Sequence, residues 1–137
     1  MEVISATDVR KEWSYTLDSV VREKPLFIKR TRDVVMLTSL EVIENLLEAY
    51  SFHAEKTLEG DGSVTLRLKE LELEQNAPDE DEAASRLAEK MLGYAEEFYD
   101  GFVGWGAHAQ DKDRLRFVLK ILVSMFTNDL KIIVNER

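Results

Sequence analysis

The chain contains no cysteine, which excludes a disulfide framework, a thiolate metal site and a cysteine nucleophile. No apolar run approaches the roughly 18 residues that a membrane-spanning helix needs. The N-terminus, MEVISATDVRK, lacks the apolar stretch of a signal peptide. From these absences we expect a cytoplasmic protein with no membrane partner.

Residues that carry catalytic or metal chemistry are scarce. The two histidines, His53 and His108, lie far apart and have neither HxxxH nor HxxE spacing, so we expect neither to bind a metal. Residues 101–106 lack the Gly-Lys-Ser/Thr of a phosphate loop and predict instead a tight loop that packs two aromatic rings. With no nucleophile and base in a recognisable pattern, the sequence predicts no cofactor, no metal and no enzyme.

The charge of the chain is unevenly distributed. The net charge is −9, yet residues 1–38 hold seven Lys/Arg against six Asp/Glu, a net +1, and the other 99 residues hold 11 against 21, a net −10. This asymmetry favours contact between the first segment and a polyanion. A solvated surface is the competing explanation, because most charge runs have no other role.

Residues 1–54 predict a β-α-β-β-α unit. A short strand at Val3 and Ile4 precedes a helix capped by Ser5 that should end near Glu23. Two apolar runs joined by polar residues 29–33 indicate a hairpin, and Thr38 with Glu41 forms a capping box for a second helix that fades near residues 52–53. One face of the first helix, expected to pack in the core, consists of Val9, Trp13, Leu17, Val20 and Val21.

Residues 63–137 predict a second, β-α-α module, with the boundary between the two in residues 55–63. Alternation over residues 64–68 is typical of a half-buried strand, and a bulge or turn follows at residues 69–70. Asp79 and Glu82 begin a helix that continues to Tyr99. A last helix over residues 111–126 has apolar residues on more than one face, which predicts burial on two sides, and a short terminal turn follows it.

Basic residues gather around the predicted hairpin. Lys29, Arg30 and Arg32 lie on or beside the turn, and Arg10 lies early in the first helix. Arginine reads guanine bidentately, and both residue types neutralise phosphate. Two copies related by a two-fold axis would present a surface suited to palindromic DNA. A solvated hairpin tip explains the same residues equally well.

Residues 1–50 also resemble the Phd/YefM family, the DNA-binding antitoxins of bacterial toxin–antitoxin operons. The resemblance lies in the order and spacing of four segments, ISATDVRK at 4–11, LDSV at 17–20, PLFIKR at 25–30 and VVMLTS at 34–39. It implies a homodimer of joined sheets flanked by helices. It also implies operator contacts from Arg10, Arg30, Lys29 and Arg32, with Thr7 on a phosphate.

The rest of the chain departs from that family, whose members usually continue as a short, poorly ordered tail. Residues 63–137 are patterned throughout, and residues 64–99 weakly resemble the strand-then-helix half of HicB-type domains, through Val64-Thr65-Leu66, Asp81-Glu82-Ala83 and Leu87-Ala88. The acidic surface of this region suits a basic ribonuclease toxin. A solvated acidic surface that keeps the protein soluble accounts for it equally well.

Together these observations predict an α+β protein of two modules. Residues 1–54 form a Phd/YefM-like unit for dimerisation and DNA binding, and residues 63–137 form a module that binds a toxin or another partner. The predicted function is an antitoxin-like repressor that binds the palindromic operator of its own toxin–antitoxin operon and neutralises the toxin. The alternative is a homodimeric interaction or scaffold protein with the same fold and without DNA binding.

Overall fold

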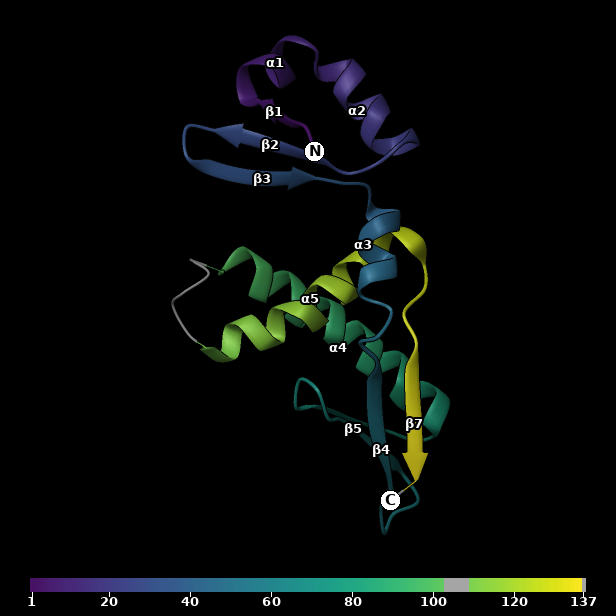
Figure 1. Ribbon diagram of the computed structural model, residues 1–137. Helices are drawn as coiled ribbons and strands as arrows, with labels where there is room; N and C mark the ends of the chain where they lie inside the picture. The colour runs from purple at the N-terminus through teal and green to yellow at the C-terminus, as the bar shows by residue number, and fades with distance from the viewer. Residues whose placement is uncertain (103–108, 137) are drawn as a thin grey trace. The chain divides into compact units, whose positions relative to one another are not determined.

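The computed structural model describes residues 1–102 and 109–136 and has an α+β fold (Figure 1). The chain divides into two compact units, Met1–Leu46 and Leu47–Arg137, and each has its own β-sheet. Residues 55–63, where we expected the boundary, contain the end of one strand and the turn into the next. Among residues 1–102 and 109–136, no helix has both the length and the apolar composition that a membrane span requires.

The first unit is a three-stranded sheet with helices. Strand β1 is parallel to β2, and β2 is antiparallel to β3, in the order β1-β2-β3. The first two helices connect β1 to β2 and lie together on one side of the sheet (Figure 1). The elements are β1 (Val3–Ser5), α1 (Ala6–Lys11), α2 (Trp13–Arg22), β2 (Leu26–Arg30), β3 (Asp33–Leu37) and α3 (Leu40–Leu46).

The prediction of a single helix after Ser5 is wrong in one respect, because the observed helix breaks at Glu12. Ser5 caps α1 as predicted, and its hydroxyl oxygen accepts the Asp8 N–H at 3.1 Å. Glu12 then has φ −120° and ψ 44°, outside the helical region, and separates α1 from α2. The break lets α2 turn Thr16 and Val20 into the unit while Trp13 stays 51% exposed. The prediction of a core-facing stripe is therefore correct for Val9 and Val20 and wrong for Trp13, Leu17 and Val21.

The cap of α3 also differs from the prediction. Ser39, not Thr38, begins the helix, with its hydroxyl oxygen 3.4 Å from the Val42 N–H. The hydroxyl of Thr38 is buried and has no hydrogen-bond partner among the described residues. Helix α3 ends at Leu46, and Phe52 begins a strand, so the helix is shorter than the apolar stripe suggested.

The second unit packs two helices on a four-stranded sheet of order β6-β5-β4-β7. Strands β4, β5 and β6 are antiparallel neighbours, and β7 is parallel to β4. Strands β4 and β7 were not predicted, and a turn at residues 69–72 separates β5 from a further strand, β6. The expected β-α-α module is therefore in fact β-β-β-α-α-β. Its elements are β4 (Phe52–Leu58), β5 (Val64–Leu68), β6 (Leu73–Ala77), α4 (Glu80–Asp100), α5 (Ala109–Thr127) and β7 (Ile132–Glu136).

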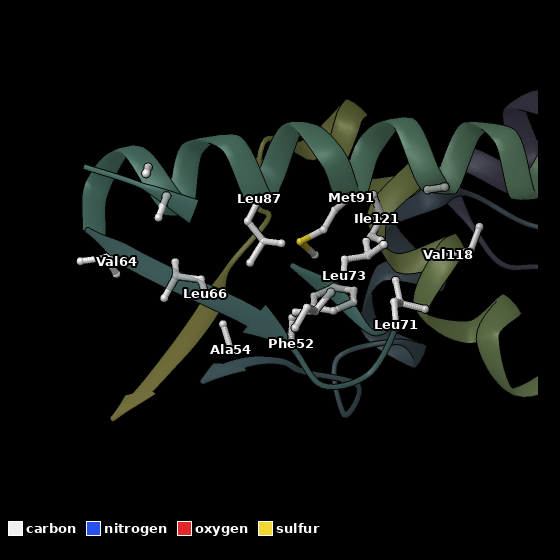
Figure 2. Close-up of a cluster of buried hydrophobic side chains, with 14 residues drawn as sticks. Phe52, Ala54, Val64, Leu66, Leu71, Leu73, Leu87, Met91, Val118 and Ile121 are labelled. Atoms are coloured by element: carbon white, nitrogen blue, oxygen red, sulfur yellow. The ribbon is translucent and has the colours of Figure 1, made fainter. Parts of the chain in front are cut away.

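The core of the second unit lies between its sheet and α4 and α5. Phe52 and Leu66 from the sheet meet Leu87 and Met91 of α4, and all four are almost completely buried (Figure 2). Asp79 caps α4 as predicted, accepting the Glu82 N–H at 2.8 Å. This core is large enough to fix one face of the sheet against the helices.

The last helix is less buried than its sequence suggested. Val118 and Ile121 of α5 are fully buried, but Met125 and Phe126 near its end are exposed, Phe126 by 77%. Burial on two sides is therefore wrong for the last turn of α5. Of the loop expected at residues 101–106, Phe102 packs against Phe98, with ring centroids 5.9 Å apart and the rings tilted by 31°. Trp105 and His108 lie outside the described residues.

Candidate nucleic-acid interface

The hairpin between β2 and β3 closes in a two-residue turn. Arg30 and Asp33 are the last paired residues, which leaves Thr31 and Arg32 as the turn. Thr31 has a φ of 56°, a conformation typical of the first turn position in the primed turns that suit twisted hairpins. The turn thus presents Arg30 and Arg32 at the end of a short ribbon.

The strand register brings the start of α1 to the same end of the sheet. In the parallel pair of β1 and β2, Ser5 lies opposite Lys29, and α1 begins directly after Ser5. Thr7, in the first turn of α1, therefore lies at the same end as Lys29 and the hairpin turn. Arg10 lies one turn further along α1, which packs against β2. All five residues predicted as DNA contacts are exposed.

The cations do not all lie on one face of the sheet. Successive strand residues point to opposite faces. Arg30 shares the face of Ile28, which is buried under the helices, whereas Lys29 shares the opposite face with Phe27. The predicted basic residues thus lie at the same end of the sheet but on both of its faces.

The cations of the first unit have no carboxylate partners among the residues that the structure describes. None of its seven Lys/Arg side chains forms an ion pair with a described residue, and each of these side chains is exposed. Every ion pair that the structure records lies in the second unit, for example Arg86 with Glu82 at 2.7 Å. Unpaired exposed cations are available to neutralise phosphate.

A hollow at the break between α1 and α2 adds aromatic surface to the same region. It has a volume of about 490 Å³ and is lined by residues 10–15. Trp13 and Tyr15 are exposed beside Arg10 and Lys11. Sequence reasoning missed this feature because helical spacing identifies an apolar face without saying what covers it.

The sheet of the first unit also has an open apolar surface. Strand β3 is an edge strand, and Val34, Val35 and Met36 are exposed although they alternate between its two faces. On the face away from the helices, Val3, Phe27 and Met36 lie side by side across the three strands. The buried apolar side chains of the whole unit are Val9, Val20 and Ile28. This unit alone leaves much of its apolar surface uncovered.

The second unit offers acidic surface but no metal site among the residues described. His53 pairs with Glu70, with 3.6 Å between Nδ1 and Oε1, and no group of three or more potential ligands occurs in residues 1–102 and 109–136. Residues 47–137 hold 19 Asp/Glu against 11 Lys/Arg, a net −8. Such a surface attracts a basic partner.

Comparison with known proteins identifies antitoxins. A family model named PHD-like, described as the antitoxin of toxin–antitoxin, RelE/RelB, TA system, matches residues 1–135. A crystal structure of the antitoxin part of a toxin/antitoxin system from Syntrophomonas wolfei subsp. wolfei is 32% identical to the chain, with a TM-score of 0.88 and 100% of both chains covered. No curated protein matches the chain.

Proposed function

Because the chain belongs to the PHD-like antitoxins of toxin–antitoxin systems, we propose that it is a homodimeric repressor of its own operon. Its first unit, of Phd/YefM type, binds a palindromic operator, and its second unit binds the cognate toxin that an antitoxin implies. The resemblance of residues 1–50 to Phd/YefM antitoxins supports the first assignment, and the acidic charge of residues 47–137 supports the second.

The DNA-binding proposal rests on the exposed cations of the first unit. Arg30 and Arg32 are presented by a hairpin turn, Arg10 by the neighbouring helix, and none of them has a described ion-pair partner. In a protein of net charge −9, cations left free at one end of one unit are available to an anionic ligand. Phosphate and the major-groove edge of guanine are the groups that such arginines recognise.

The open edge of β3 supports the homodimer. An edge strand with exposed apolar residues on both faces pairs readily with another strand. Two copies of β3 related by a two-fold axis would join the sheets and cover Val34, Val35 and Met36. The two hairpin turns would then lie at opposite ends of the β3 pair, which suits two half-sites of a palindrome.

The test of DNA binding compares two arginines of the same unit. Arg30→Gln removes a proposed base or phosphate contact, whereas Arg22→Gln removes an exposed charge at the end of α2, away from the hairpin. We expect Arg30→Gln to weaken operator binding by about 1–3 kcal/mol, measured by fluorescence anisotropy, and Arg22→Gln to change it much less. Equal effects of the two variants would remove the proposed role of the hairpin.

The alternative is a homodimeric interaction or scaffold protein with this fold. The charge of the first unit favours it, since residues 1–46 hold eight Asp/Glu against seven Lys/Arg. That protein would bind DNA weakly at physiological salt, and neither arginine substitution would matter. Operator binding that responds to Arg30 alone excludes this alternative.

A further inference from the structure

The two edges of the second sheet differ in how their backbone groups are satisfied. At the β6 edge, side chains of α4 reach the carbonyls that point away from β5. Lys90 Nζ donates to the Glu74 carbonyl at 3.1 Å, and Arg86 Nη1 donates to the Asn76 carbonyl at 3.2 Å. Natural proteins commonly protect an edge strand in this way against pairing with other chains.

The opposite edge is β7, which has β4 on one side only (Figure 1). The His53 carbonyl accepts the Lys69 N–H at 2.9 Å on the β5 side, so the backbone groups of Ala54 and its alternate neighbours point toward β7. In the parallel register that pairs Ala54 with Val134, these groups bond to Ile133 and Asn135. The N–H and C=O groups of Val134, and of Ile132 and Glu136, therefore point to the open edge.

This open edge is apolar and lacks side-chain protection from the described part of the chain. No hydrogen bond of the kind that covers β6 reaches the backbone of β7 from residues 1–102 or 109–136. Ile133, on the face away from the core, is 48% exposed. An edge of this kind accepts an added strand from another protein, with main-chain hydrogen bonds supplying affinity.

We propose that the cognate toxin adds an extended segment to β7 and so continues the sheet of the second unit. This inference rests on the proposed role of residues 47–137 in toxin binding. The acidic net charge of these residues favours a basic toxin over a second, equally acidic copy of the chain as the added strand. The toxin segment forms main-chain hydrogen bonds with Ile132, Val134 and Glu136.

Amide hydrogen exchange of the full chain tests the proposal, with the purified product of the adjoining toxin gene as the probe. We expect the toxin to slow exchange at Val134 and Glu136, whose N–H groups are free in the antitoxin alone. Slowed exchange confined to other elements, with β7 unchanged, would overturn the proposal while leaving toxin binding intact. Slow exchange at Val134 before toxin is added, lost on dilution, would assign the edge to a second copy and also overturn it.

A matched pair of variants tests the same hydrogen bonds by affinity. Val134→Pro removes the outward N–H at a position where an edge strand tolerates proline, and Val134→Ala removes two methyl groups of the side chain but keeps the N–H. We expect Val134→Pro to bind the toxin about tenfold or more weakly than Val134→Ala, as for one lost main-chain hydrogen bond. Circular dichroism establishes that both variants are folded.

Equal affinities of two folded variants would overturn the added strand. If Val134→Pro fails to fold, Ile132→Pro against Ile132→Ala repeats the test at the next outward N–H. Complete absence of binding between the unmodified proteins would instead contradict the toxin-binding role of the second unit, and with it this inference.

Discussion

Thr31 holds the hairpin turn in a conformation that costs a β-branched residue free energy. Its φ of 56° lies in the left-handed region, which asparagine adopts more readily than threonine. We expect Thr31→Asn to raise the free energy of unfolding of the first unit by about 1 kcal/mol, measured by urea denaturation. Thr31→Ala keeps the unfavourable geometry and should give no comparable gain. A destabilised Thr31→Asn variant would contradict the strained turn.

Substitutions at Thr38 and Ser39 test which of the two residues caps α3. Ser39→Ala should destabilise the protein by about 1 kcal/mol, because the Val42 N–H loses its acceptor. Thr38→Val should leave stability unchanged or raise it, since the buried Thr38 hydroxyl has no described partner. Thermal unfolding of the two variants checks both. A loss of stability in Thr38→Val and none in Ser39→Ala would contradict the observed cap and support the predicted capping box of Thr38.

For single residues, the helix caps could be predicted from the sequence, but the burial of an apolar side chain could not. Ser5 and Asp79 cap their helices as their residue types indicate, because a cap depends on only a few neighbouring residues. The spacing of Trp13 predicts a buried position on a helical face, yet Trp13 is exposed, because spacing reveals neither the helix break at Glu12 nor the surface that covers a face. Its exposure in one chain is consistent with a partner, which a sequence pattern does not reveal.

The edge strand β3 is the element that decides whether the first unit dimerises as proposed. Val35 is 59% exposed in its middle. We expect Val35→Lys to dissociate the dimer, because a lysine on an edge strand opposes strand pairing. Leu58→Lys, on an exposed residue of β4, is the matched control and should leave the dimer intact. Sedimentation equilibrium measures the difference, and a monomeric control or a dimeric Val35→Lys would exclude pairing through β3.

Among the elements, those with strong local patterns were predicted and those that depend on distant partners were not. The α4 stripe and the alternation of β5 are visible in short windows of sequence. Strands β4 and β7 pair in parallel although more than seventy residues separate them, as between Phe52 and Ile132. Such pairing depends on the tertiary fold, and β4 carries His53, Glu55 and Lys56, which hid its strand character.

For the whole molecule, the structure separates a unit with free cations from a unit with net acidic charge. In the described part of the chain, no Lys or Arg of the first unit pairs with a carboxylate, whereas the second unit pairs several of its own and carries a net −8. A toxin bound to the second unit of each copy would change operator affinity by altering the number of DNA-binding units held together. Such coupling is reciprocal, so operator DNA would change toxin affinity by the same factor.

Operator binding by the first unit is tested most directly with the full chain and the DNA immediately upstream of its own gene. Fluorescence anisotropy measures the affinity over a range of salt concentrations. We predict tight, salt-dependent binding that is strongly weakened in the Arg10→Ala/Arg30→Ala double variant, whose salt slope is lower by roughly 2. Binding no tighter than to DNA of shuffled sequence, or unchanged in the double variant, would contradict the proposal that the first unit is an operator-binding repressor.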